Sequence, residues 1–153
     1  MTTIAYKDGV IAYDSQISRG DVIVYDDYDK CLIRDGVRFF CAGATADFPV
    51  LVDAYFGGRQ VGPVDVTALV LDGDILMLVA VDNDTGLWKT PIMRDRPYAI
   101  GSGMSFAFAA MDMGASADRA VEAAAKRDTG TGGTIRVFRI PADGQTNTSV
   151  QPA

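Results

Sequence analysis

Apolar residues in this sequence fall into short segments separated by Asp-Gly pairs and other turns that contain Gly. Asp8-Gly9 and Asp35-Gly36 each stand between two apolar segments, so each predicts a β-hairpin. A third hairpin is predicted around residues 72–74. The pattern predicts strands at residues 2–6, 10–14, 21–25, 31–34, 37–42, 66–71, 75–81, 87–92, 98–100 and 134–140.

Three other segments carry patterns that are typical of helices. Residues 48–56 fit a short helix with Pro49 in its first turn and a Gly pair after its end. Residues 104–113 are apolar on nearly all sides, which predicts a helix buried between layers. Residues 117–126 are rich in Ala, and the Ser just before them can cap a third helix.

The predicted strands and helices cluster in separate runs and do not alternate. This order favours an α+β fold of packed layers over a doubly wound α/β fold. The chain has 153 residues, of which 48% are apolar and 22% charged, which is enough for one domain with its own core. We therefore expect a single domain over residues 1–140 and a polar, disordered tail at residues 141–153.

Charge and hydropathy restrict the partners and the compartment. The net charge is −6 and the basic residues are scattered, which is unfavourable for binding the phosphates of nucleic acid. No apolar run approaches the roughly 18 residues that suggest a membrane span. No basic segment followed by an apolar one marks a secretory signal. We therefore expect a cytoplasmic protein that binds neither nucleic acid nor a membrane.

The sequence contains no histidine. This excludes Ser-His-Asp catalysis, Cys-His catalysis and any metal site built on histidine. Cys31 and Cys41 do not form a CxxC pair, and we interpret them as half-buried thiols on strands. No cofactor and no metal are therefore expected. A hydrolase with this sequence needs another general base: a carboxylate, a lysine with a depressed pKa, or the α-amine of the chain.

Thr2 is the candidate for such chemistry, because Met1 followed by a small residue is the usual context for removal of the initiator methionine. Removal leaves a hydroxyl and a free amine on one residue. An amine with an unperturbed pKa of about 7.7–8.0 can accept the hydroxyl proton. If Met1 is retained, the amine belongs to the wrong residue. The first hairpin also brings Asp14 close: a two-residue turn places it opposite Thr3, and a three-residue loop places it opposite Thr2.

Several short motifs accompany Thr2 along the chain. They are Thr2-Thr3-Ile4-Ala5, Gly9-Val10-Ile11-Ala12-Tyr13-Asp14-Ser15, Lys30, Ala42-Gly43-Ala44-Thr45-Ala46-Asp47, Ile100-Gly101-Ser102-Gly103 and Arg127-Asp128-Thr129-Gly130-Thr131-Gly132-Gly133. In this order they resemble the β-subunits of proteasomes over residues 2–140, above all the bacterial HslV type and archaeal β-subunits. The resemblance implies the fold of N-terminal-nucleophile (Ntn) hydrolases, an αββα four-layer sandwich of two antiparallel sheets, here with one outer helix shortened or missing.

The resemblance also implies roles for individual residues around the nucleophile. Thr2 would be the nucleophile, and Asp14 and Lys30 would form a buried charged pair beside it. The positive charge of Lys30 lowers the pKa of neighbouring groups, and Asp14 orients and balances it. Gly43 would donate its backbone N–H to the oxyanion, at a place where the backbone must approach the substrate closely.

Other positions are implied to hold the amine and the substrate. Ser102, Asp128 and Thr131 would surround the α-amine and hold it by hydrogen bonds. The family more often has Ser where Thr131 stands, but either hydroxyl can serve. Cys41 and Thr45 lie where the family forms its main specificity pocket, which indicates an apolar substrate side chain of medium size.

The sequence departs from the family pattern at residues 59–65, where the family has a second long helix. That helix contributes to packing between subunits and rings, so its absence weighs against the usual double ring and against docking to an ATPase unfoldase. We still expect self-association into a homo-oligomer, with a ring among the options. A domain with one thin outer helical layer exposes apolar sheet surface.

Three functions stay open at this point. The first is a threonine-type peptidase that cleaves polypeptides through an acyl-enzyme on Thr2 after Met1 has been removed. The second is a non-catalytic assembly protein that keeps the fold for contacts between subunits, which the missing helix favours. The third is a small-molecule amidohydrolase that uses the same chemistry.

Overall fold

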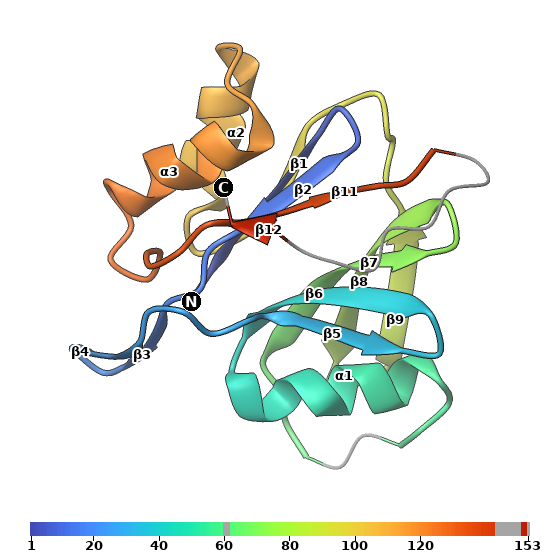
Figure 1. Cartoon of the computed structure of the whole chain (residues 1–153). Helices are drawn as coiled ribbons and strands as arrows, with labels where there is room; N and C mark the ends of the chain where they lie inside the picture. The colour runs from blue at the N-terminus through green and yellow to red at the C-terminus, as the bar shows by residue number, and fades with distance from the viewer. Residues whose placement is uncertain (60–61, 143–150, 153) are drawn as a thin grey trace. The chain divides into compact units, whose positions relative to one another are not determined.

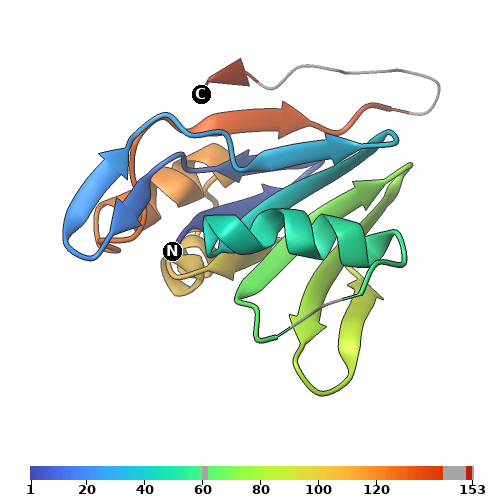
Figure 2. The same cartoon turned by 90° about the horizontal axis from the view of Figure 1, so that it is seen from below.

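The computed structural model describes residues 1–59, 62–142 and 151–152. It is an α+β structure with antiparallel sheets and three helices, as the order of elements predicted (Figure 1 and Figure 2). The chain forms two compact units. Unit 1 comprises Met1–Lys30 together with Met93–Ala153, and unit 2 comprises Cys31–Ile92. Among the described residues, no helix is long and apolar enough to cross a membrane.

Unit 1 is built on a sheet in which the strand order is β10-β1-β2-β11-β12. Each strand is antiparallel to its neighbours, and β1 lies between β10 and β2. The start of the chain is therefore held between two strands, one of which comes from the second half of the sequence. The strands are β1 (Thr3–Lys7), β2 (Val10–Tyr13), β10 (Tyr98–Gly101), β11 (Arg136–Arg139) and β12 (Gln151–Pro152).

The hairpin of β1 and β2 decides which residue lies opposite Asp14. Asp8 and Gly9 form the turn with φ angles of 51° and 77°, as a two-residue type I′ turn requires. Just beyond the paired strands, the backbone N–H of Asp14 donates to the carbonyl oxygen of Thr3 at 3.2 Å. Of the two predicted registers, the one with Thr3 opposite Asp14 is therefore observed.

Two helices, α2 (Met104–Asp112) and α3 (Ala117–Ala125), pack against this sheet (Figure 1). The strands present Ala5, Ala12 and Ala99 to them, and these three small residues lie side by side in register. Short side chains allow the helices to approach the strands closely. The helices therefore hold the strand that begins next to Thr2.

The prediction that the helix at residues 104–113 is buried between layers is wrong. Ala107 and Met111 are the buried residues of α2, whereas Met104 and Phe106 are 41% and 42% exposed, and Met113 just after the helix is 88% exposed. A segment that is apolar on every side does not indicate how many of its sides meet a partner. Here the contacts of α2 are with β1, β10 and α3, so the opposite side faces solvent.

Between β2 and Lys30 the chain forms a two-stranded sheet of β3 (Ile17–Arg19) and β4 (Val22–Tyr25). The strand predicted at residues 21–25 is confirmed as β4, and all four of its residues are exposed. The partner strand β3 was not predicted, because three residues are too few to show alternation. In Figure 1 this hairpin extends away from α2 and α3 of the same unit.

Unit 2 is an antiparallel sheet whose strands follow one another in sequence order. One short helix packs against it, and its Phe48, Leu51 and Val52 join Phe39 and Cys41 in the core. The strands and the helix predicted here are confirmed to within one or two residues. The elements are β5 (Cys31–Arg34), β6 (Val37–Gly43), the 3-10 turn η1 (Thr45–Asp47), α1 (Phe48–Tyr55), β7 (Val66–Asp72), β8 (Ile75–Asp82) and β9 (Gly86–Pro91).

Two further predictions fall partly outside the described residues. Residues 56–59 and 62–65 contain no helix, and residues 60–61 lie outside the description. In the predicted disordered tail, residues 143–150 and 153 also lie outside it, while β12 pairs with β11. The extent of the single domain and the disorder of the tail therefore stay predictions.

Candidate active site

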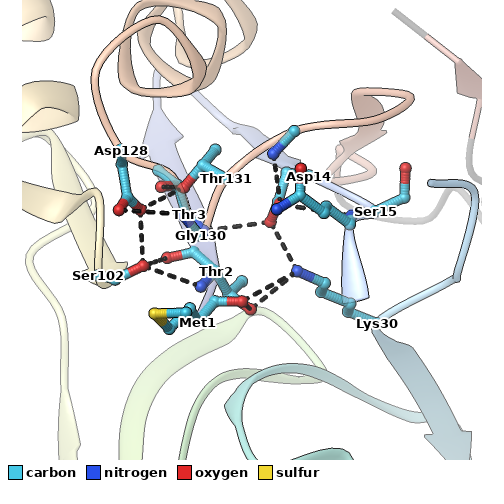
Figure 3. A network of polar contacts seen from close by, with 12 residues as sticks. Met1, Thr2, Thr3, Asp14, Ser15, Lys30, Ser102, Asp128, Gly130 and Thr131 are labelled. Carbon is cyan, nitrogen blue, oxygen red and sulfur yellow. Dashed lines mark hydrogen bonds and ion pairs between the residues drawn. The ribbon is translucent and has the colours of Figure 1, made fainter. Parts of the chain in front are cut away.

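The backbone of Thr2 is held by the segment that follows β10. The amide N–H of Thr2 donates to Oγ of Ser102 at 3.2 Å. The carbonyl oxygen of Thr2 accepts from the backbone N–H of Gly103 at 3.4 Å and also lies 3.4 Å from Oγ of Ser102. Hydrogen bonds at its amide nitrogen and at its carbonyl oxygen therefore fix the backbone of Thr2, which is only 1% exposed (Figure 3).

The hydroxyl of Thr2 lies against the ammonium of Lys30. Nζ of Lys30 donates to Oγ1 of Thr2 at 2.8 Å, and Oγ1 in turn donates to the carbonyl oxygen of Met1 at 2.5 Å. Nζ also lies 3.4 Å from that Met1 oxygen. One cation therefore contacts both the candidate nucleophile and the carbonyl of the residue before it (Figure 3).

Asp14 is the partner of this cation, and neither side chain is exposed to solvent. Oδ1 of Asp14 accepts from Nζ of Lys30 at 2.8 Å and from the backbone N–H of Thr3 at 3.1 Å. Oδ2 accepts from the backbone N–H groups of Gly132 at 3.0 Å and Gln16 at 3.4 Å. Four donors thus hold the carboxylate, which satisfies the condition under which a buried ion pair can persist.

Burial lowers the pKa of Lys30 from its ordinary value of 10.5, because desolvation disfavours the ammonium. The negative charge of Asp14, its hydrogen bond and the more distant Asp128 act in the opposite direction. The ammonium at this place is therefore easier to deprotonate than that of a solvated lysine.

A second polar cluster surrounds the amide nitrogen of Thr2. Oδ2 of Asp128 accepts from the hydroxyls of Ser102 and Thr131, each at 2.6 Å, and Oδ1 accepts from the N–H of Gly130 at 3.2 Å. Burial alone would raise the pKa of Asp128, but these three hydrogen bonds, assisted by the positive chain terminus, lower it below 3.8. The hydroxyl of Thr131 also lies 2.6 Å from that of Thr3, which ties the cluster to β1.

No protein-family profile and no curated protein matches the chain. Solved structures do match. Thiobacillus denitrificans BPH in complex with epoxomicin matches with a TM-score of 0.66 at 18% identity, covering 92% of this chain and 99% of that one. HslV from Trypanosoma brucei matches with a TM-score of 0.66 at 20% identity, covering 90% and 97%. The chain has the HslV-type fold.

A second structure of Thiobacillus denitrificans BPH agrees, with a TM-score of 0.64 at 19% identity and coverage of 93% of this chain and 99% of that one. The HslV-type fold is the one that the motifs implied, and the matches span nearly the whole of each neighbour. At such low identities the likeness concerns the fold. The chemistry must therefore be argued from the site itself.

Within the HslV-type fold, unit 1 brings together six of the nine residues that the sequence singled out. They are Thr2, Asp14, Lys30, Ser102, Asp128 and Thr131, which come from five separate parts of the chain. Among the described residues no group of three or more His, Cys, Asp or Glu side chains could hold a metal ion.

The other three residues belong to unit 2, and their proposed roles stay predictions. Gly43 is the last residue of β6, and its part in an oxyanion hole rests on the resemblance alone. Cys41 is fully buried in the core of unit 2, and desolvation raises the pKa of its thiol, with Cys31 adding to the shift. Thr45 begins η1 and is half-buried.

Sequence reasoning missed residues that support the site. Gly101 has a φ of +97°, and a Cβ atom there would lie 2.0 Å from the carbonyl oxygen of Thr2, so β10 can approach the chain start only with Gly. The Gly-Ser-Gly motif was the available signal. Gln16 donates from Nε2 to the carbonyl oxygen of Thr129 at 2.9 Å and so holds the loop that carries Thr131. No pattern in the sequence marks Gln16.

Proposed function

We propose that this protein is a threonine-type peptidase whose nucleophile is the hydroxyl of Thr2, active once the peptide bond between Met1 and Thr2 has been cleaved. The observation that carries the proposal is the pair of contacts at Thr2. Its Oγ1 lies 2.8 Å from Nζ of Lys30, and its backbone nitrogen lies 3.2 Å from Oγ of Ser102. A hydroxyl beside a cation and a nitrogen beside a hydrogen-bond acceptor are what an N-terminal nucleophile requires.

The freed nitrogen of Thr2 is the proposed general base. The hydroxyl oxygen adds to the carbonyl carbon of the substrate while its proton moves to the amine. The C–N bond then breaks, the leaving amine takes that proton, and the acyl group stays on Oγ1 as an ester. Water adds to the ester, gives a proton to the amine, and the Thr2 oxygen leaves and is reprotonated.

The surrounding charges support each half of this cycle. The ammonium of Lys30 stabilises negative charge on Oγ1, and Asp14 keeps that ammonium in place. Ser102, which is itself held by Asp128, orients the nitrogen of Thr2 toward its own hydroxyl. The site supplies every proton acceptor that the reaction needs without histidine, which the sequence lacks.

The proposal extends to the fold and the partners. We assign the full four-layer αββα arrangement, a polypeptide substrate and self-association into a homo-oligomer on the strength of the HslV-type fold. Gly43 as donor to the oxyanion, and Cys41 with Thr45 as specificity residues, belong to the same assignment. Docking to an unfoldase is not part of it.

The test begins with the intact mass of the purified chain, which reports whether Met1 is present. A second preparation is made through a cleavable fusion that leaves Thr2 as the first residue. Both are incubated with an electrophile that reacts with N-terminal threonine, and with epoxomicin, which Thiobacillus denitrificans BPH binds. We expect labelling of Thr2 in the form that starts at Thr2, none after Thr2→Ala, and full labelling in the control Thr90→Ala. Absence of labelling in the Thr2-first form overturns the proposal.

One observation favours the second candidate function, a non-catalytic assembly protein. With Met1 in place, its carbonyl oxygen accepts the Thr2 hydroxyl and lies within reach of Lys30, so the polar groups of the site satisfy one another. That candidate predicts that Met1 is retained in the native protein and that Thr2→Ala leaves assembly unchanged. Peptide cleavage by the native protein would exclude it.

A further inference from the structure

Two exposed surfaces of unit 1 are left unused by the proposed chemistry. The first, the hairpin surface, is formed by Val22, Ile23, Val24, Tyr25 and Tyr28. Val22, Ile23 and Tyr25 are 63%, 59% and 59% exposed, and no residue of β4 is buried. An exposed strand with apolar residues on both faces is rare on a monomeric protein, because such a strand tends to pair or associate with other chains.

The hairpin surface is bordered by acidic residues. Asp21 precedes β4, and Asp26 and Asp27 follow it. Asp27 is paired with Arg136 at 2.8 Å, whereas the carboxylates of Asp21 and Asp26 have no partner within the described chain. The partner of this surface must therefore be apolar at its centre and positively charged at its edge.

The second surface, the helical hollow, has that chemistry. It is a depression of about 420 Å³ between the outer sides of α2 and α3. Its apolar lining is formed by Phe106, Ala109 and Ala123, and its charged lining by the cations Arg119, Lys126 and Arg127 together with one acidic residue, Glu122. Arg119 is paired with Glu122, but the side chains of Lys126 and Arg127 have no partner in the part of the chain that the structure describes.

We infer that the hairpin surface of one copy of this chain docks into the helical hollow of a second copy. The two surfaces are both apolar at the centre and carry opposite charges at the edge. Tyr, which the hairpin surface contributes, and Arg, which the helical hollow contributes, are both enriched at interfaces. No residue of the hairpin surface lines the hollow of its own copy, and in Figure 1 the hairpin lies apart from α2 and α3. This deepens the self-association that forms part of the proposed function.

The contact joins two different surfaces and is therefore heterologous. Each copy offers one hairpin and one hollow, so copies add head to tail, and the assembly closes into a ring or continues as a filament according to the rotation at the contact. A contact of this kind also depends on salt. Screening between the charged edges is strong near 1 M salt, where the Debye length is about 3 Å.

The first test measures the mass of the full-length chain by sedimentation velocity over a wide concentration range. Ile23→Ser removes an apolar side chain from the hairpin surface, and Ile75→Ser, at an equally exposed site in unit 2 (59% and 53% exposed), is the matched control. We expect Ile23→Ser to weaken association by about tenfold or more, and Ile75→Ser to leave it unchanged. A wild-type chain that stays monomeric, or equal effects of the two changes, overturns the inference.

The second test exchanges the charges and does not depend on apolar contacts. Asp26→Lys and Lys126→Glu should each weaken association alone, because each places like charges across the contact. An equal mixture of the two variants should associate again, since every contact between unlike copies then pairs opposite charges. A mixture that stays as weak as its components overturns the inference. The peptidase proposal is tested by labelling of Thr2, whereas the docking of copies is tested by the mass of the assembly in solution. Either proposal can therefore fail without the other.

Discussion

Nζ of Lys30 lies 2.8 Å from Oγ1 of Thr2, in a place where Lys30 has no exposed surface and Thr2 is 1% exposed. A cation so placed cannot be screened by water, and its effect on the hydroxyl is correspondingly large. The same burial disfavours the cation itself, which is why the carboxylate of Asp14 at 2.8 Å is needed. The geometry of the candidate nucleophile therefore rests on one buried ion pair.

Removal of one member of this pair should destabilise the fold. Lys30→Met leaves the carboxylate of Asp14 buried and without its cation, and we expect a loss of about 3–5 kcal/mol in the free energy of unfolding. Urea denaturation measures it, and Arg34→Met is the control. Arg34 pairs with Asp53 at a site where both side chains are about half exposed or more, so its loss should cost less than about 1 kcal/mol.

The double variant Asp14→Asn with Lys30→Met separates pairing from packing. If the two side chains stabilise each other, the double variant loses clearly less than the sum of the single losses. Additive losses would show that Asp14 and Lys30 contribute independently, and the account of a coupled pair would then be wrong.

On the proposed mechanism, in the form that begins at Thr2, the pH dependence of acylation follows from two groups with opposite requirements. The amine of Thr2 must be neutral, so the rate should rise with pH through about 7.7–8.0. Lys30 must stay protonated, and because burial lowers its pKa, the rate should fall at a pH below 10.5. Lys30→Arg, in which the charge persists to higher pH, should keep the rising limb and lose the falling one. A wild-type rate that keeps rising to pH 10.5 would contradict this.

The local elements of the fold could be predicted from the sequence because their causes are local. Asp-Gly at residues 8–9 and 35–36 marks two-residue turns, and the apolar segments on either side of each turn are predicted to pair as antiparallel strands. The short strand β3 carries no such signal. The exposure of α2 could not be predicted either, because an apolar helix does not indicate which of its sides will find a partner.

The site is different, because its residues are far apart in sequence. Nothing in the local pattern places Lys30 beside Thr2 or Asp128 beside Ser102; the order of motifs predicted these contacts through resemblance to a known fold. Asp14 is the exception, since the first hairpin alone predicts that it lies opposite Thr2 or Thr3, and the structure decides for Thr3. The contacts of Thr3 with Thr131 and of Gln16 with Thr129 were found only in the structure, where they join the loop at residues 128–132 to β1 and to the segment after β2.

Gly101 should be indispensable to the position of Thr2. In Gly101→Ala the new Cβ would lie 2.0 Å from the carbonyl oxygen of Thr2, so β1 and β10 must separate. Gly114→Ala is the matched control: its φ of +102° carries the same backbone strain as the +97° of Gly101, but it has no atom within 4 Å of the new Cβ.

We expect Gly114→Ala to lose about 1 kcal/mol in the free energy of unfolding from strain alone. Gly101→Ala should lose about 1–3 kcal/mol more from the steric conflict. Thermal or urea unfolding of both variants decides it. Equal losses would mean that the close approach of β10 to Thr2 is not a constraint on the fold.

Asp128 should make the folded protein sensitive to acid. Its folded-state pKa lies below 3.8, so the unfolded chain takes up a proton at a higher pH than the folded one. The stabilisation from Asp128 is therefore complete well above pH 3.8 and is lost as the pH falls through the folded-state value. In Asp128→Asn this contribution is absent at every pH.

The difference in unfolding free energy between wild type and Asp128→Asn should thus be largest near neutral pH and should shrink below pH 3.8. Asp95→Asn, which removes an exposed carboxylate elsewhere in unit 1, should show no comparable trend. A difference that is constant with pH would mean that the hydrogen bonds from Ser102 and Thr131 do not favour the ionised form of Asp128. The proposal that the Asp128 carboxylate holds Ser102 in place beside the nitrogen of Thr2 would then lose its support.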